Sequence, residues 1–480
     1  MTSKSIKLNF FYNIILQMSK VIFPLITTPY VARVLEPEGV GLSNFASTYA
    51  GYFALFAALG LPTYGIREIA KTGNDKISQT KFVSEAISLT IITTLFCVIF
   101  FLISVFCIPQ LNENFLIFAI SALGLYISPF KIDWYFQGKE EFGYITFRSL
   151  IIKVISIICL FIFVNEKEDL LNFVIINAAC TSVNELWNYI KLYKTGIHPY
   201  FTLHFSKHLK PLLILFSSSI AISIYTVLDT LMLGFMTSYD EVAYYNSATN
   251  ISKTILPIAT SLAAVVMPRM AFYLKENNWQ EMKTLLNKSL SVVSFLSFPL
   301  TFALIAIAPI FIPLFYGEQF IGAVLPLQIV AGVIISIGFN NLFGVQILVG
   351  LGKDKLFLYA VLVGTFSNFI LNLVLIPLLG ASGASISTVI AETLILFVEI
   401  WLVQKYTNVR FNLGNDVIIC FLVSLLFFPL IHILSYLTNN WILIGCFTVI
   451  GTFIYLSLLY LLKNAALLSF IAIIKKRIKI

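Results

Sequence analysis

Polar side chains recur at helical spacing within three otherwise apolar stretches of this 480-residue chain, the first, seventh and eighth of the fourteen described below. The faces consist of Asn9, Asn13, Gln17, Lys20, Pro24 and Thr27 in the first stretch, Ser219, Ser223, Thr226, Asp229 and Thr230 in the seventh, and Asn246, Asn250, Lys253, Pro257 and Thr260 in the eighth; apart from the two prolines these residues are polar. Residues three or four apart share one helix face. A polar face does not suit lipid, so these helices are predicted to line a hydrated cavity.

Two lysines supply the positive charges in these faces. Lys20 lies about ten residues from the inner end of its helix and Lys253 about eleven from the outer end of its own, so both fall near the bilayer midplane at about 1.5 Å per residue. A central Lys opposes membrane insertion by roughly 2.5–3.5 kcal/mol. This cost favours a cationic cavity that binds an anionic group. Lys153 is shallower, on the fifth stretch, and is able to snorkel inward. The predicted substrate-binding set therefore includes Lys20, Lys253, Lys153 and the amides Asn13, Gln17 and Asn250.

Internal ion pairing is the alternative interpretation of the two central lysines. Asp229 lies toward the outer side of the seventh stretch, and Glu392 lies in the middle of the twelfth. A pair between Lys20 or Lys253 and one of these carboxylates would be a packing contact. The same two carboxylates are candidates for coupling transport to protons or sodium ions. The other acidic residues near inner helix ends are predicted to be interfacial: Glu85, Asp133, Glu185 and Glu399.

Fourteen apolar stretches must position these side chains. Their approximate spans are 10–34, 40–62, 83–108, 113–136, 146–164, 170–192, 211–234, 242–266, 289–315, 320–350, 355–379, 381–404, 415–438 and 441–463. Each is long enough to cross a hydrocarbon core, which takes roughly 20 helical residues. Lipid satisfies no backbone hydrogen bond, so the stretches are predicted to be helices and the chain an all-α integral membrane protein. Twelve helices is the alternative if the last pair is atypical.

The distribution of Lys and Arg supports this topology. With the N-terminus in the cytoplasm, 26 of the 31 basic residues fall on the inner side or at inner helix ends. Arg33 and Lys167 fall outside, and Lys20, Lys153 and Lys253 lie within spans. This bias follows the positive-inside rule and places both termini in the cytoplasm.

The composition excludes several classes of protein. The chain is 59% hydrophobic and 11% charged, unlike a soluble globule. Its net charge of +8 is spread over short inner loops, where it sets topology and meets anionic lipid, so no nucleic-acid partner is expected. The six Cys residues lie in apolar spans without metal-ligand spacing. We expect no cofactor and no metal, and we interpret the first stretch as a retained helix rather than a cleaved signal.

Two six-helix lobes are predicted around a central cavity. The inner loop 193–210 follows six stretches and marks the boundary; its histidines, His198, His204 and His208, are predicted to be solvated, with a metal site as the alternative. The predicted parts are an N-terminal lobe (1–195), a C-terminal lobe (196–410), two further helices (411–463) and a basic cytoplasmic tail (464–480). The outer connections are short, which leaves no room for an extracytoplasmic catalytic domain, so we do not expect an enzyme.

Four segments in order resemble the polysaccharide repeat-unit flippases, the Wzx-type family of the multidrug/oligosaccharidyl-lipid/polysaccharide (MOP) exporter superfamily. They are "LQMSKVIFPLITTPYVARVLEPEGVG" (16–41), "YFALFAALGLPTYGIREIAK" (52–71), "DWYFQGKEEFGYITFRSLIIKVISI" (133–157) and "EVAYYNSATNISKTILPIATSLAAVVMPRM" (241–270). The resemblance covers the first nine helices well and the last five by hydropathy alone.

The resemblance implies a substrate and site residues. Members of the family move an isoprenoid-pyrophosphate-linked oligosaccharide from the inner to the outer leaflet and use cations in a central cavity. Lys20 and Lys253 lie in matching segments, so the resemblance implies that these two lysines are the cations of the cavity. Arg33 also matches, at the outer end of the first helix. Three roles are compatible with this position: substrate contact, part of an exit gate, or a structural contact. Arg148 and Lys153 match in the fifth helix. The implied partners are the lipid-linked substrate, membrane lipid and polysaccharide-assembly proteins, and we expect a monomer.

Rival functions predict other residues. A drug or cation antiporter of the same superfamily, similar to the MATE transporters, should hold acidic residues in the cavity, whereas the deepest polar positions on the matched helices are lysines. A membrane glycosyltransferase, ligase or polymerase needs acids or arginines on a large outer loop. A scaffold without transport activity predicts that changes in the polar faces have no functional effect.

Overall fold

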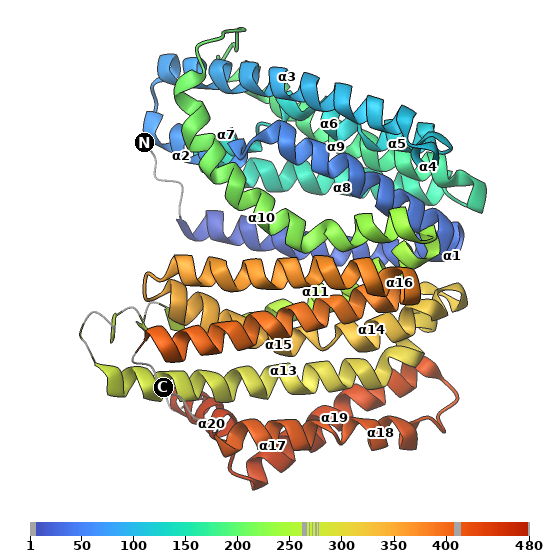
Figure 1. Cartoon of the computed structure of the whole chain (residues 1–480), viewed down its shortest axis with the longest axis vertical. Helices are drawn as coiled ribbons and strands as arrows, with labels where there is room; N and C mark the ends of the chain where they lie inside the picture. The colour runs from blue at the N-terminus through green and yellow to red at the C-terminus, as the bar shows by residue number, and fades with distance from the viewer. Residues whose placement is uncertain are drawn as a thin grey trace. The chain divides into compact units, whose positions relative to one another are not determined.

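The computed structural model describes residues 6–261, 278–407 and 414–478, with residues 266, 267, 269, 270, 272, 273 and 276. Within these residues every regular element is a helix, as predicted (Figure 1). Among the described residues, eight helical segments are long and apolar enough to cross a membrane, and 115–130 is a shorter apolar stretch. Leu8–Thr72 and Asp354–Tyr406 each contain two predicted stretches. The exact number of fourteen stays a prediction.

The chain divides into two compact units, Met1–Val242 and Ala243–Ile480, which are described separately. The predicted lobe boundary after residue 195 remains a prediction. The first unit contains α1 (Ile6–Ala58), α2 (Leu61–Thr72), α3 (Lys76–Cys107), α4 (Pro109–Asn112), α5 (Phe115–Ser121), α6 (Leu123–Tyr126), η1 (Ser128–Phe130), α7 (Asp133–Gly138), α8 (Phe142–Phe163), η2 (Lys167–Asp169), α9 (Leu170–Lys194) and α10 (Ser206–Met236).

The second unit begins within α11 (Tyr239–Thr260). Its other helices are α13 (Trp279–Tyr316), η3 (Glu318–Ala323), α14 (Val324–Val330), α15 (Val333–Asn340), the π-helix η4 (Asn341–Val349), α16 (Asp354–Tyr406), α17 (Asn415–Ser424), α18 (Phe427–Leu434), α19 (Asn440–Leu461) and α20 (Ala465–Ile478). Two predicted stretches, 113–136 and 320–350, are thus series of short helical pieces. The helices α9 and α11 correspond to the predicted stretches 170–192 and 242–266. Their Asn and charged residues lower their mean hydropathy, so neither is among the eight segments.

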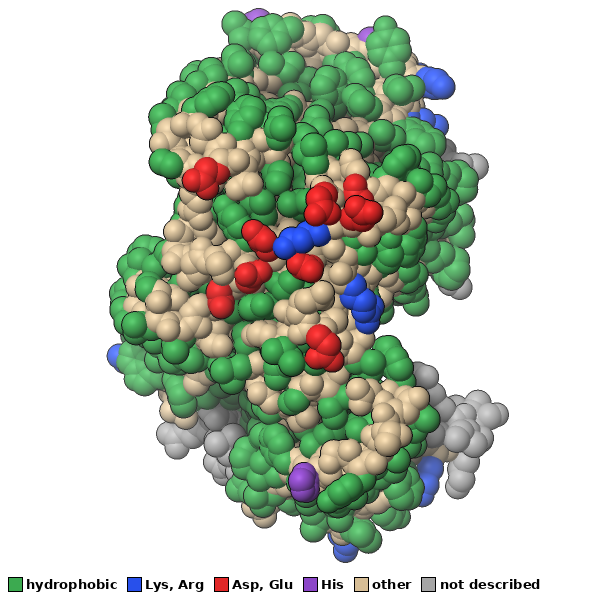
Figure 2. All heavy atoms as spheres, turned by 90° about the vertical axis from the view of Figure 1, so that its right-hand side faces the viewer, with side chains coloured by type: hydrophobic (Ala, Val, Ile, Leu, Met, Phe, Trp, Pro, Cys, Tyr) green, Lys and Arg blue, Asp and Glu red, His purple; other side chains and the backbone are tan. Residues whose placement is uncertain are grey.

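The first unit is built around α1, which packs against α3, α8 and α10. Glu36 has left-handed φ (56°) and breaks α1 just before Pro37, where the chain doubles back (Figure 1). Lys167 of η2 clamps this turn through ion pairs with Glu36 (2.9 Å) and Glu38 (3.3 Å). Figure 2 views the side on which the α1 label stands in Figure 1, and acidic side chains gather there around a few Lys and Arg.

The second unit is organised by α16, which packs against α14, α15 and η4. Gly380 (φ 55°) breaks this helix between the two predicted stretches. The two halves pack on each other, because a Cβ added to Gly364 would lie 2.3 Å from Cγ1 of Ile395. α16 is therefore a helical hairpin, whose second half carries Glu392 and Glu399.

Candidate functional site

The first half of α1 presents the predicted polar face away from the protein interior. Asn13, Gln17 and Lys20 are exposed, and Gln17 Nε2 donates a hydrogen bond to Asn13 Oδ1 (3.3 Å). In the described part of the chain Lys20 forms no ion pair and no hydrogen bond, so the alternative pairing of Lys20 with Asp229 or Glu392 is not formed. An unpaired ammonium beside two amides is chemically suited to an anion that carries further hydrogen-bonding groups.

Lys153 of α8 joins this face. Its Nζ donates to Ser19 Oγ (2.9 Å) and lies 5.2 Å from the ring centroid of Phe23. The Lys153 and Lys20 ammonium groups are close enough to act on each other electrostatically. Two cations held together repel each other, and a multiply charged anion between them would relieve that repulsion. Asn13, Gln17, Lys20 and Lys153 form one group, hereafter the cationic face.

Arg33 does not belong to the cationic face. It lies 13 positions after Lys20 on α1, or roughly 20 Å along the helix axis at about 1.5 Å per residue. Its side chain is exposed, and Nη1 donates to the Pro29 carbonyl (3.3 Å). This local bond holds the Arg33 side chain against α1.

In the second unit, α11 presents Asn250 and Lys253 on an exposed face, with Pro257 following on the same side. The opposite face of α11 is buried, and the Tyr316 hydroxyl donates to the Ser247 carbonyl there (3.3 Å). The predicted polar faces of α1 and α11 therefore both point away from the core of their own unit.

The two candidate coupling carboxylates are buried, in different units. Asp229 on α10 is 4% exposed and acts electrostatically on the Tyr52 phenol of α1. Glu392 on α16 is 4% exposed and accepts a hydrogen bond from Asn340 Nδ2 (2.7 Å). The side chains of the other predicted polar residues of α10, namely Ser219, Ser223 and Thr226, lie outside the described residues.

Glu85, Glu185 and Glu399 are buried within the protein. Their predicted depth at the membrane interface stays a prediction. Sequence position fixes the depth of a residue along a helix but not the neighbour that its side chain meets. Glu399 is considered further below.

Glu85 and His208 form one buried cluster of the first unit. Glu85 pairs with Lys207 (2.9 Å) and with His208 Nε2 (2.8 Å), while Nδ1 of His208 bonds the Tyr64 hydroxyl (2.8 Å). His208 is thus buried rather than solvated, whereas His198 and His204 are exposed as predicted. No group of three or more His, Cys, Asp or Glu side chains able to hold a metal occurs among the described residues.

Arg148, which the family resemblance pointed to, is a buried structural residue. Its Nη2 donates to Asp133 Oδ1 (2.9 Å), which also accepts from Asn188 Nδ2 (2.7 Å). Asn188 Nδ2 lies 3.3 Å from Glu185 Oε2 as well. Because Arg148 is only 1% exposed, this network ties α7, α8 and α9 together and is not open to a large substrate.

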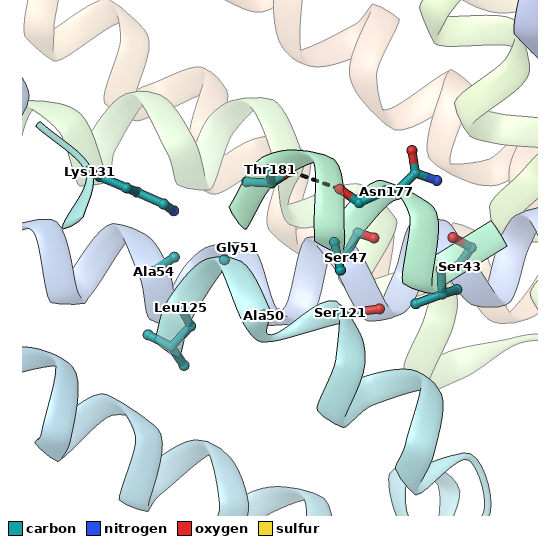
Figure 3. Close-up of a pocket in the computed structure, with 13 residues that line it drawn as sticks. Ser43, Ser47, Ala50, Gly51, Ala54, Ser121, Leu125, Lys131, Asn177 and Thr181 are labelled. Atoms are coloured by element: carbon teal, nitrogen blue, oxygen red, sulfur yellow. Dashed lines mark hydrogen bonds between the residues drawn. The ribbon is translucent and has the colours of Figure 1, made fainter. Parts of the chain in front are cut away.

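A polar pocket of about 210 Å³ in the first unit was not predicted from the sequence. Its polar lining comes from α1, α5, α9 and the segment before α7: Ser43, Ser47, Ser121, Asn177, Thr181 and Lys131. Figure 3 shows the Lys131 side chain reaching toward the pocket. The four-residue spacings of Ser43 with Ser47 and of Asn177 with Thr181 were the available signal. Hydroxyls, an amide and one ammonium suit a hydrated or hydroxyl-rich group.

An apolar groove of about 430 Å³ lies in the second unit between α11, α13, α18 and α19. Ile258, Phe295, Pro299, Phe447 and Leu456 are among its lining residues. The groove has the chemistry of a hydrocarbon site, because nearly all of its lining is apolar.

The fold defines the class of the protein. It matches the lipid II flippase MurJ in an inward closed conformation with a TM-score of 0.74 at 16% identity, over 94% of this chain and 98% of that one. It also matches an inward-facing multidrug resistance MATE family transporter of the MOP superfamily, with a TM-score of 0.58 at 17% identity over 79% and 92% of the two chains. The protein is a multi-pass membrane protein with the transporter fold of the MOP superfamily.

The family follows from sequence. A family model described as polysaccharide biosynthesis protein matches residues 6–274, and a MatE model matches residues 215–374. The putative O-antigen transporter of Escherichia coli K12 is 25% identical over 407 residues, which cover 84% of this chain and 97% of that protein. The chain belongs to the polysaccharide biosynthesis protein family, and the predicted membership of the Wzx-type group of the MOP superfamily is confirmed.

Proposed function

We propose that this protein is a flippase that moves isoprenoid-pyrophosphate-linked oligosaccharide repeat units from the inner to the outer leaflet for surface polysaccharide synthesis. The observation that carries the proposal is the cationic face, where Lys20 and Lys153 place two ammonium groups beside the amides of Asn13 and Gln17. The names of relatives, an O-antigen transporter among them, support the same substrate class.

The chemistry of the substrate matches the parts of the site. A pyrophosphate carries several charges and suits two adjacent cations, while amides bond sugar hydroxyls. Lysines hold a phosphate as point charges and not as a bidentate fork, which favours reversible binding. The apolar groove of the second unit offers a surface for the isoprenoid tail, which must stay out of water while the head crosses.

Transport in this proposal proceeds by alternating access between the lobes 1–195 and 196–410, with Lys253 and Asn250 supplying the second lobe's contacts and Arg33 acting at the outer exit. Asp229 and Glu392 couple the cycle to ions. The protein works in the bacterial cytoplasmic membrane as a monomer, with both termini in the cytoplasm and polysaccharide-assembly proteins nearby.

The second candidate is a MATE-like cation or drug antiporter, favoured by the buried carboxylates Asp229 and Glu392. The two candidates differ in which charges bind substrate. An antiporter requires the carboxylates to bind a cationic drug and is indifferent to Lys20, whereas the flippase requires the lysines.

The test uses a deletion strain of the source bacterium complemented with variants checked for normal membrane abundance. Lys20→Ala and Lys253→Ala should each lower surface polysaccharide at least tenfold and cause lipid-linked units to accumulate inside, while Lys20→Arg retains part of the activity. Lys283→Ala, which removes an exposed lysine of α13, is the matched control and should complement fully. Full complementation by both Lys20→Ala and Lys253→Ala would refute the proposal.

A further inference from the structure

Two carboxyl groups are buried on one face of α16. Glu392 and Glu399 are seven residues apart, or two helical turns, and are 4% and 0% exposed. Both face the series of short helices that packs on α16, in which Asn340 ends α15 and Gly344 lies in the π-helix η4.

The two carboxyl groups differ in their partners. Glu392 Oε2 accepts a hydrogen bond from Asn340 Nδ2 (2.7 Å). Neither oxygen of Glu399 makes a hydrogen bond in the described part of the chain, although the Gly344 backbone comes close. A Cβ added to Gly344 would lie 2.2 Å from Glu399 Oε1, so the glycine makes room for the carboxyl group. Oδ1 of Asn340 and Oε1 of Gln346 are likewise buried without a partner.

Within the described residues, neither Glu392 nor Glu399 forms an ion pair with a Lys, Arg or His side chain. The helices α14, α15 and η4, which pack against α16, contain no Asp, Glu, Lys, Arg or His. α11 bonds α16 through Tyr245 and Thr388 (3.2 Å), and its Lys253 lies on the exposed face of that helix. The charged residues at the ends of α16, Lys353, Asp354, Lys355 and Lys405, form no ion pair with either carboxyl group among the described residues.

The physical consequence is that a carboxyl group in this position is protonated and uncharged. An ionised carboxylate that is buried without a partner costs several kcal/mol, and a protonated one costs far less. Two neighbouring carboxyl groups also oppose each other's ionisation. A proton needs one oxygen, whereas a metal ion needs several ligands, so the arrangement at Glu399 suits a proton better.

A purely structural acid would be expected to have its hydrogen bonds satisfied, as most buried polar groups do. Glu399 does not, and it faces a π-helix, a rare conformation that is frequent at functional sites. We infer that Glu399, with Glu392 beside it, is a proton-exchange site of the second unit. In the present conformation Glu399 is a carboxylic acid; when the packing of η4 on α16 opens, its O–H bond breaks, the proton passes to water and a carboxylate remains. The inference rests on the proposed function in one respect, because the proton exchange is assigned to the transport cycle of the flippase.

The experiment combines infrared spectroscopy of the full-length protein in lipid vesicles with complementation. At pH 7, well above the value of about 4.3 for a solvated Glu, wild-type protein should show the C=O band of a protonated carboxyl group. Glu399→Gln should lose the part of that band that belongs to Glu399 while the part from Glu392 remains, and Glu318→Gln, which alters an exposed carboxylate of η3, should leave the band unchanged. In the deletion strain Glu399→Gln should be present at normal abundance and lower surface polysaccharide at least tenfold.

Absence of the band in wild-type protein, or an unchanged band intensity in Glu399→Gln, would overturn the inference. Partial loss of the band with full complementation by Glu399→Gln would overturn it too, since a permanently neutral side chain would then suffice. The two experiments test different claims. Full complementation by Lys20→Ala and Lys253→Ala would refute the flippase proposal but would not affect the conclusion that Glu399 is protonated.

Discussion

At the scale of single residues, the main result is that the ammonium groups of Lys20 on α1 and Lys153 on α8 are close enough to interact electrostatically. Lys153 is anchored by Ser19 and Phe23, which bring its charge next to that of Lys20. The sequence predicted each lysine separately from the insertion cost of a buried charge. It could not predict their proximity, because that depends on how α8 packs on α1.

A second residue-scale feature is Asp169 in the connection between α8 and α9. Its carboxylate accepts hydrogen bonds from the backbone N–H groups of Asn165 (2.9 Å) and Glu166 (3.1 Å) and from Asn172 Nδ2 (2.8 Å). These bonds, that from Asn165 first, lower the pKa of Asp169. A lowered pKa adds stability above the unfolded-state value of about 3.9, and this stability is lost as the pH falls through the folded-state pKa.

We therefore predict that amide protection of the connection 165–172 is constant from pH 7 to about pH 4 and then falls. Asp169→Asn should show weakened protection already at pH 7, and Glu168→Gln, a neighbouring exposed carboxylate without such bonds, should not. Hydrogen exchange corrected for the intrinsic rate at each pH measures both. Equal protection of wild-type protein and Asp169→Asn at pH 7 would contradict this account.

At the scale of elements, the helices divide into those that hydropathy predicts and those that packing decides. The break of α16 fell where the sequence placed it, between the stretches 355–379 and 381–404, because Gly380 adopts a left-handed φ. The fragmentation of 320–350 into η3, α14, α15 and η4 was not predicted, since an uninterrupted apolar run gives no signal for a π-helix. The same limitation hid the burial of Glu399.

The α16 hairpin depends on a small residue at Gly383. A Cβ added there would lie 2.1 Å from the carbonyl oxygen of Leu375, a backbone atom that cannot rotate away. Gly383→Ala should therefore destabilise the protein by about 1–3 kcal/mol. Gly445→Ala is the control, because nothing lies within 4 Å of its added Cβ, and in a helix it should be neutral or slightly stabilising.

Thermal unfolding of the purified variants in detergent measures this difference. The midpoint should fall for Gly383→Ala and stay or rise for Gly445→Ala. An unchanged midpoint for Gly383→Ala would show that the two halves of α16 approach less closely than described.

At the scale of the whole molecule, the first unit carries the cationic face, and the second carries the apolar groove and the buried pair Glu392 and Glu399. A lipid-linked oligosaccharide has the same division into an anionic head and a hydrocarbon tail. The family and the fold are consistent with the proposal that such a molecule is moved across a bilayer. The central claim is that the cationic face binds the pyrophosphate.

The most direct test is the affinity of the purified protein in nanodiscs for a long-chain polyisoprenyl diphosphate, compared with the uncharged polyisoprenol. The account predicts that Lys20→Gln raises the Kd for the diphosphate at least tenfold, a loss of about 1.4 kcal/mol, and leaves binding of the alcohol unchanged. Lys283→Gln should bind both lipids as the wild-type protein does. Equal diphosphate affinity in wild-type protein and Lys20→Gln would contradict the account.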